Sequence, residues 1–319
     1  MTWLVILAQL VLPLGLIGWL ALAPAKSAAG YIVQTTGTGI ALLALALIAL
    51  WMLLPWWLPY LFGVLWFLAL ALRVWRHGLK FDERQPSSVA AWLVIVVMGA
   101  LGVFAGYLSW EAVKGRQRPD AAVVDIALPL GPGTYLVAHG GSRQLVNGHM
   151  MTLDPTVERF RAYRGQSYGI DFIKVNSLGF RANGLQPRDP AAYEIYGEPV
   201  YAPCEGTIVA SRDDRPDMPV PVMDLEVIEG NHVLLRCDDV ALLLAHFRPG
   251  SVRVRTGDRV HVGERLGMVG NTGKTTEPHL HVSAQRLGSK PLPFSGEPLA
   301  ITIGGRYLVR NDRLRGGLR

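Results

Sequence analysis

The sequence predicts an α-helical membrane anchor of four transmembrane helices followed by a mainly-β domain. Half of the 319 residues are hydrophobic, and the excess is concentrated in three stretches near the N-terminus that contain no charged side chain. From about Asp120 the composition changes to short β-branched runs separated by Gly, Pro, Asn and Asp. Such runs are typical of strands joined by turns.

The three uncharged stretches hold the four predicted spans, because about 20 apolar residues are enough to cross the hydrocarbon core of a bilayer. They cover residues 1–25, 27–72 and 85–110. The middle stretch is long enough for two spans, with a tight turn at Pro55 and Pro59. For the first stretch a cleavable signal peptide is the alternative, although no basic region precedes its apolar run.

Basic residues in the short loops give the predicted orientation. Arg73, Arg76, Lys80 and Arg84 follow the third span, and Lys26 follows the first. The positive-inside rule places both loops in the cytoplasm, with the chain after the fourth span outside. We therefore expect a multi-pass protein of the cytoplasmic (inner) membrane, held in the lipid bilayer by four helices, with its C-terminal domain on the periplasmic side.

The predicted organisation is an anchor over residues 1–110, a linker over 111–134 and a β domain over 135–319. Residues 1–119 carry a formal charge of +5 and residues 120–319 one of +1, so the basic balance belongs mainly to the loops beside the membrane. Nothing resembles the basic face of a nucleic-acid-binding protein, and we expect no nucleic-acid partner. The spans contain no ionisable residue, which disfavours transport or sensing by the helices themselves.

Two cysteines, Cys204 and Cys237, lie in strand-like segments of the β domain. In an oxidising compartment they can pair as a disulfide. Alternatively they are two separate small hydrophobic residues of the core. Neither has a neighbouring cysteine or histidine at the spacing of a metal site.

The stretch "TTEPHLHVSAQ" contains two histidines on a predicted strand, His279 and His281. Residues two apart on a strand face the same way, so both imidazoles project together while Leu280 points into the core. Pro278 suggests that the strand begins there. A His-x-His pair alone is more typical of surface histidines beside a turn, so its context decides.

That context resembles the M23 (lysostaphin/LytM-type) zinc metallopeptidase family. The motifs are "GEPVYAPCEGTI", "HFRPGSVRVRTGDRV", "GNTG" and "HLH", in the order and at the spacings of the family. The resemblance covers about residues 165–305. It implies an antiparallel β-sheet fold of the LytM/lysostaphin type (a duplicated hybrid motif), one Zn²⁺ per chain and endopeptidase activity.

In this family the metal is held by a His and an Asp of an early motif and by the second His of His-x-His. Asp171 stands in place in "QSYGIDF", but Ser167 occupies the position where many members have histidine, and a serine hydroxyl is a poor zinc ligand. Some members instead resemble "N-x-H" followed by "Q-x-Y-x-x-D-F". Asn147-Gly-His149 fits that pattern, so we expect His149 as first ligand, with His139 as the alternative.

The resemblance then implies a role for each remaining histidine of the site. His149, Asp171 and His281 would hold zinc and leave a fourth position for water, as in catalytic rather than structural zinc sites. By position, His246 of "LLLAHF" and His279 would accept the proton of that water and stabilise the oxyanion or the leaving amine.

Five further residues have weaker assignments. Asn147 is a candidate for orienting a ligand from behind, and Tyr168 and Asn271 are candidates for the rim of a cleft. His232 is expected at a turn, and His261 is expected to face solvent.

The leading functional hypothesis is a membrane-anchored zinc metalloendopeptidase that hydrolyses peptide bonds in peptidoglycan cross-links, stem peptides or another extracytoplasmic peptide. The alternative is a catalytically inactive M23-like module that binds cell wall or regulates another hydrolase. What separates the two is whether His149 reaches Asp171.

Overall fold

The computed structural model describes residues 2–23, 25–78, 85–86, 88–287 and 292–317. The chain divides into two compact units. One contains residues 1–49 and 54–113, and the other contains residues 50–53 and 114–319.

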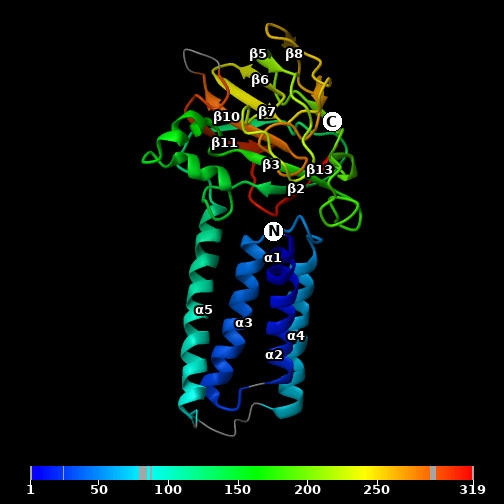
Figure 1. Cartoon of the computed structure of the whole chain (residues 1–319). Coiled ribbons are helices and arrows are strands. Elements are labelled where there is room, and N and C mark those ends of the chain that lie inside the picture. The colour runs from blue at the N-terminus through cyan, green and yellow to red at the C-terminus, as the bar shows by residue number, and fades with distance from the viewer. Residues whose placement is uncertain (1, 24, 79–84, 87, 288–291, 318–319) are drawn as a thin grey trace. The chain divides into compact units, whose positions relative to one another are not determined.

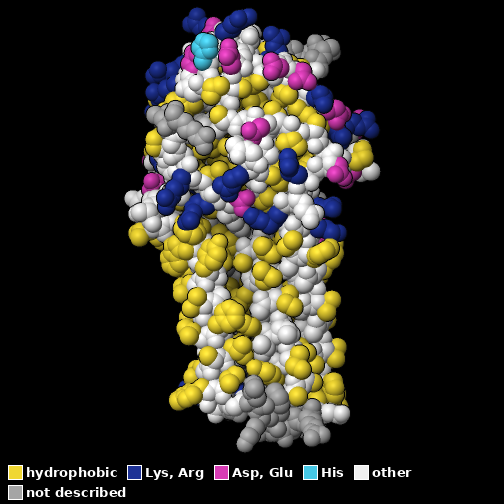
Figure 2. All heavy atoms as spheres, turned by 180° about the vertical axis from the view of Figure 1, so that it is seen from behind, with side chains coloured by type: hydrophobic (Ala, Val, Ile, Leu, Met, Phe, Trp, Pro, Cys, Tyr) yellow, Lys and Arg dark blue, Asp and Glu magenta, His cyan; other side chains and the backbone are white. Residues whose placement is uncertain are grey.

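The helical unit contains four helices that are long and apolar enough to cross a membrane (Figure 1). The first runs through α1 (Thr2–Ile6), a π-helical turn (Leu7–Val11) and α2 (Leu12–Leu22), and it is followed by α3 (Ala28–Ile48), α4 (Leu58–His77) and α5 (Val89–Gly115). The prediction of four apolar helices is confirmed. Hydrophobic side chains cover much of the outer surface of these helices (Figure 2).

Proline explains two local features of this unit. Pro13 has no N–H and its ring crowds the carbonyl four residues earlier, and the π-helical turn Leu7–Val11 lies where this conflict arises. Pro59 lies in the first turn of α4, where a missing N–H costs no hydrogen bond. Of the basic residues used for the predicted orientation, Lys80 and Arg84 lie outside the described residues.

Gln34 supplies the main polar contact between helices of this unit. Its side-chain amide donates to the carbonyl oxygens of Trp19 and Ala23, at 3.3 and 3.1 Å, and its Oε1 accepts from the backbone N–H of Ala25. The carbonyl of Ala23, the C-cap residue of α2, thereby gains a partner that the helix itself cannot supply, whereas the Trp19 carbonyl also accepts from the backbone N–H of Ala23. A buried glutamine in an apolar helix thus joins α3 to the end of α2.

The second unit is a mainly antiparallel β domain (Figure 1). Its large sheet has the strand order β13-β2-β3-β10-β7-β6-β5-β8. In addition, β11 pairs with β10, and β1 and β12 each pair with β11. A small second sheet pairs β4 with β9. The only parallel pair among the described strands joins β1 to β11. The strands are β1 (Val123–Ile126), β2 (Gly133–His139), β3 (Ile170–Val175), β4 (Pro199–Tyr201), β5 (Gly206–Arg212), β6 (His232–Cys237), β7 (Val240–Ala245), β8 (Arg259–Val260), β9 (Arg265–Met268), β10 (Leu280–Arg286), β11 (Pro298–Ile303), β12 (Arg306–Tyr307) and β13 (Arg313–Gly316).

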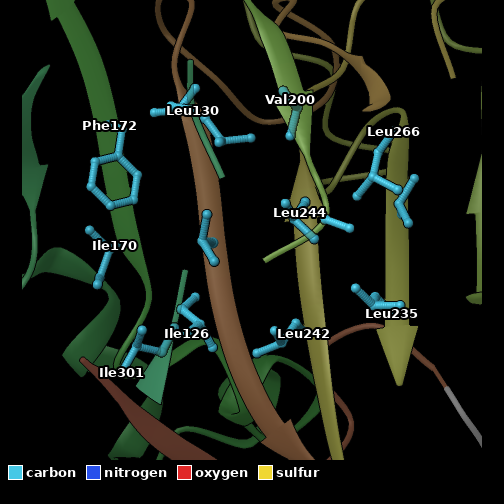
Figure 3. Close-up of a cluster of buried hydrophobic side chains, with 14 of the residues drawn as sticks. Ile126, Leu130, Ile170, Phe172, Val200, Leu235, Leu242, Leu244, Leu266 and Ile301 are labelled. Carbon is cyan, nitrogen blue, oxygen red and sulfur yellow. The ribbon is translucent and has the colours of Figure 1, made fainter. Parts of the chain in front are cut away.

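Alternation along the central strands separates a packed core from the face that carries the polar residues. Ile170 and Phe172 of β3 and Leu242 and Leu244 of β7 point into one hydrophobic layer (Figure 3). Leu280 of β10 is fully buried in the same layer, as predicted. Since successive strand residues face opposite ways, the residues between these positions project from the other face of the sheet.

The two cysteines form a disulfide, which decides between the two alternatives left open by the sequence. Cys204 follows β4 and Cys237 ends β6, and the bond joins positions 33 residues apart with their Cα atoms separated by 6.2 Å. Such a cross-link reduces the conformational freedom of the unfolded chain.

We expect Cys204→Ser with Cys237→Ser to lower the free energy of unfolding by about 3 to 4 kcal/mol, the loop-closure entropy for a loop of this length. The melting temperature of the β domain should fall by roughly 10 °C. Circular dichroism during heating measures this shift. Dithiothreitol should destabilise the wild-type protein similarly and leave the double variant unchanged, and equal sensitivity of both proteins would contradict the prediction.

Candidate metal centre and its flanking histidines

Strand register brings the carboxylate and one imidazole of the site together. Asp171 of β3 is directly opposite His281 of β10, and both are buried. Directly opposed residues on neighbouring strands point to the same face, so the two side chains meet. The Nδ1–H of His281 donates to Asp171 Oδ1 at 2.8 Å.

His149 reaches the same point from outside the sheet. It is the second residue of a 3₁₀ helix, η2 (Gly148–Leu153), and its Nε2 lies 3.5 Å from Asp171 Oδ2. One potential ligand atom from each of His149, Asp171 and His281 lies within 4.8 Å of the others. The three residues predicted as ligands are therefore adjacent, and they form a site that could hold a metal ion.

Asn147 orients His149 from behind. Its Oδ1 accepts from the backbone N–H of His149 at 3.1 Å and from its ring Nδ1 at 3.0 Å. Its amide group donates to the carbonyl oxygens of Gly141 and Gly169 and is fully buried, which fixes its direction. The proton of His149 therefore sits on Nδ1, and the lone pair of Nε2 faces Asp171, as a metal ligand requires.

Two electrostatic features fit a cation at this point. Burial by itself raises the pKa of Asp171, but the surrounding His149, His279 and His281 outweigh it and hold the pKa well below its usual value, so the carboxylate is ionised. Burial lowers the pKa of His149 to about 3, which keeps its imidazole neutral. In addition, Nε2 of His281 is buried without a hydrogen-bond partner among the described residues. A carboxylate and two imidazoles are a donor set suited to zinc.

His279 lies beside this cluster. The strand β10 begins at Leu280 rather than at the expected Pro278, so His279 directly precedes it. Its Nδ1–H donates to the carbonyl oxygen of Glu277 at 2.9 Å, and its Nε2 lies 3.7 Å from Asp171 Oδ1. The prediction that both imidazoles of His-x-His project together agrees with this geometry.

His246 faces His279 from the end of β7. Their ring centroids are 4.6 Å apart, and the Nδ1–H of His246 donates to the carbonyl oxygen of Thr272 at 2.7 Å. Burial and the neighbouring histidines hold its pKa well below the usual value. Its backbone adopts a φ of +68°, a left-handed conformation that costs about 1–3 kcal/mol and is found disproportionately at functional sites.

His139, the alternative first ligand, is close to the cluster but differently engaged. It lies opposite Asp171 on β2, and its Nδ1 accepts from the backbone N–H of Gly148 at 3.1 Å and from Arg310 at 3.2 Å. This geometry favours His149 as the ligand. His139 instead supports the backbone that enters η2.

Ser167, at the position where many family members have a histidine, contacts the segment that carries His149. It is fully buried, its hydroxyl contacts Thr152 Oγ1 at 2.8 Å, and Thr152 Oγ1 donates to the carbonyl oxygen of His149 at 2.8 Å. Ser167 also donates to the carbonyl oxygen of Arg164 at 2.6 Å. The serine thus braces the 3₁₀ helix that carries His149.

The remaining candidates are placed as follows. Asn271 is fully buried, donates to the carbonyl oxygen of Met218 and accepts from Thr275, so it lines no exposed surface. Tyr168 is half-buried, and burial raises its pKa. His261 is exposed, as expected.

The expectation that His232 lies at a turn is wrong, because it is buried at the start of β6. Thr275, which is not among the residues predicted for the site, also contacts it: its hydroxyl lies 3.0 Å from His279 Nδ1. The sequence signal for this contact is a hydroxyl-bearing residue four positions before the histidine.

We expect His149→Ala to weaken zinc binding by more than about 100-fold, because loss of an outer partner alone costs about 10- to 100-fold. The measurement is competition with a chelator for zinc, using the full chain in detergent. His139→Asn is the matched control, since its amide oxygen can replace the acceptor Nδ1 of His139. The opposite ranking of the two variants would reverse the assignment of the ligand.

Gly169 is also expected to be intolerant of a side chain. A Cβ there would lie 2.7 Å from Cε1 of His281 and 2.9 Å from the carbonyl oxygen of Gln166. Gly169→Ala should displace the imidazole and weaken zinc binding by roughly 10- to 100-fold. Gly317→Ala, where no atom lies within 4 Å of the new Cβ, should bind zinc normally. Unchanged affinity of the Gly169 variant would show that the imidazole is not confined as the geometry indicates.

Comparison with known proteins finds a family match within the β domain. Residues 191–293 match the family described as Peptidase family M23. An 85-residue segment is 29% identical to Peptidoglycan DD-endopeptidase ShyA of Vibrio cholerae, and it covers 27% of this chain but 17% of that protein.

Among solved structures, the catalytic domain of the prophage-encoded M23 protein EnpA from Enterococcus faecalis (a mutant form) is 20% identical, with a TM-score of 0.28, over 41% of this chain and 73% of that one. The catalytic domain of lysostaphin from Staphylococcus simulans is 25% identical, with a TM-score of 0.25, over 38% of this chain and 68% of that one. The chain therefore contains a mainly antiparallel β domain in which residues 191–293 resemble peptidase family M23.

Proposed function

We propose that this protein is a membrane-anchored zinc metalloendopeptidase that hydrolyses peptide bonds in the cross-links or stem peptides of peptidoglycan. The observation that carries the proposal is the adjacency of His149, Asp171 and His281, with His279 close to Asp171 and His246 against His279. Three protein ligands leave a coordination position for water, which is typical of catalytic zinc sites. When bound there, zinc supplies Lewis acidity, which acidifies a coordinated water and polarises a scissile carbonyl.

His246 and His279 provide the proton transfers in this proposal. Each donates its Nδ1–H to a backbone carbonyl, so each presents an unprotonated Nε2. One imidazole accepts a proton from the attacking water, and the protonated ring can then donate to the leaving amine. The other ring, when protonated, stabilises negative charge on the carbonyl oxygen. Both rings have the same kind of hydrogen bond at Nδ1, so either ring can take either role.

Differences in exposure support an approach of substrate from one side. The side chains of Asp171 and His281 are 7% and 3% exposed, whereas those of His149 and His279 are 18% and 15% exposed. The carboxylate is therefore shielded from water, and the imidazoles at the edge remain accessible. A peptide would meet His149 and His279 first.

The proposed substrate class is based on sequence similarity to a peptidoglycan peptidase. The curated relative is by its name a peptidoglycan DD-endopeptidase, although the matched segment spans about a sixth of its length. Extended peptides with small side chains, such as those that cross-link peptidoglycan, suit a site at the edge of strands. We therefore propose peptidoglycan peptides rather than folded proteins as substrates.

The proposed location is the inner membrane, with the β domain on the periplasmic side. Four helices of sufficient length and apolarity support an integral membrane protein. The disulfide between Cys204 and Cys237 supports an oxidising compartment for the β domain, since disulfides are rare in the cytosol. The bias of basic residues in the helix loops agrees with this orientation.

The test is hydrolysis of cross-linked muropeptide dimers by the full chain in detergent, followed by chromatography of the products. A chelator should abolish product formation, and added zinc should restore it. His246→Ala and His279→Ala should each keep zinc but lose about 10²- to 10⁴-fold in rate, the usual contribution of a general acid or base.

His261→Ala is the matched control, since that side chain is 81% exposed and contacts Glu205 rather than the site. A protein that is fully loaded with zinc but cleaves neither dimers nor intact peptidoglycan would contradict the proposal. It would then be a wall-binding or regulatory module.

A further inference from the structure

A buried ion pair lies directly behind the His-x-His motif. Arg181 donates from Nε to Glu277 Oε1 at 2.7 Å and from Nη2 to Glu277 Oε2 at 2.8 Å. The two residues are 3% and 4% exposed. Two parallel hydrogen bonds between a guanidinium and a carboxylate fix the direction of both groups as well as their distance.

The antiparallel pairing of β3 with β10 brings these distant residues together. Leu280 pairs with Phe172 in antiparallel register, so the segment that follows β3 and the segment that precedes β10 lie at the same end of these two strands. Arg181 is in the first of these segments and Glu277 in the second, 96 residues later.

Arg181 itself is firmly supported. Its carbonyl oxygen accepts from the backbone N–H of Glu194 at 2.8 Å, and the next residue, Ala182, forms a β-bridge with Tyr193. Its guanidinium also donates to the carbonyl oxygen of Leu185 at 3.0 Å and lies over the ring of Tyr193. The arginine is therefore a rigid anchor rather than an adaptable partner.

Glu277 connects Arg181 to His279 through its side chain and its backbone. Its carbonyl oxygen accepts from the Nδ1–H of His279 at 2.9 Å and from the hydroxyl of Thr275 at 2.6 Å. Because a carbonyl oxygen can only accept, and because the nearby Thr275 hydroxyl donates to this same oxygen, the arrangement places the imidazole proton on Nδ1. The side chain of Glu277 is held by Arg181 while its backbone holds His279.

We propose that Arg181 and Glu277 are positioning residues for His279. Their ion pair fixes the carbonyl oxygen of Glu277, which in turn keeps His279 in the tautomer that presents an unprotonated Nε2 to the metal centre. The catalytic part of this inference rests on the proposed function. Stability alone is a weak explanation for the pair, because apolar residues of similar size can replace buried ion pairs without loss of stability.

The decisive variant is therefore the apolar double replacement, Arg181→Met with Glu277→Leu, which leaves no unpaired charge in the interior. Arg181→Lys is the second variant, since it keeps the charge but cannot form the two parallel hydrogen bonds. Lys174→Met with Glu198→Leu is the matched control. It removes an ion pair with an N–O distance of 2.7 Å that makes no contact with Glu277.

The first readout is the tautomer of His279 in the full chain in detergent, read from long-range ¹H–¹⁵N spectra of histidine-labelled protein and assigned with His279→Gln. We expect the Nδ1–H form in the wild type and the control, and a mixture of tautomers in the apolar variant. Should that variant fail to fold, the Arg181→Lys spectrum decides. Retention of the pure Nδ1–H form in a folded variant would overturn the proposal.

The second readout is kinetic. With muropeptide dimers, kcat should fall about 10- to 100-fold in the apolar variant, as for other losses of an outer partner, while KM and the zinc content stay unchanged. An unchanged kcat in that variant would also overturn the positioning role. If the wild type cleaves no substrate, the proposed function fails, and the tautomer spectra still decide whether the ion pair positions His279.

Discussion

The pairing of β3 with β10 is the constraint on which the rest of the site depends. Its register sets Asp171 opposite His281 and, on the same strands, directs Phe172 and Leu280 into the core. A slip by one residue would send the two polar side chains into that core and the apolar ones outward. The hydrophobic layer therefore protects the geometry of the polar face. The register of one strand pair therefore sets both the core packing of Phe172 and Leu280 and the alignment of Asp171 with His281.

Parts of this arrangement follow from sequence alone. The four apolar helices and the mainly-β domain are visible as uncharged stretches and short β-branched runs, because both signals are local. The convergence of His279 and His281 follows from the spacing of strand residues. The expected start of this strand is wrong, however, since His279 precedes β10 and is held by a backbone carbonyl instead of a strand partner.

Other parts depend on contacts between residues far apart in the chain and carry no local signal. The burial of His232 arises from its pairing with Ala245 of β7, which no pattern around "EGNHV" reveals. Likewise the pairing of Arg181 has no local signal, because its partner Glu277 is 96 residues away. The disulfide was one of two open alternatives, because sequence does not give the distance between Cys204 and Cys237. Each case required the three-dimensional path of the sheet.

Ser167 lies beside the segment that carries His149. In the pattern common to many M23 members a histidine would stand at this position, and serine alone suggests a lost metal site. Here the small buried hydroxyl joins Thr152 to the turn at Arg164, and Thr152 holds the carbonyl oxygen of His149. Ser167, through Thr152, and Asn147 therefore both hold the segment that brings Nε2 of His149 to 3.5 Å from Asp171 Oδ2.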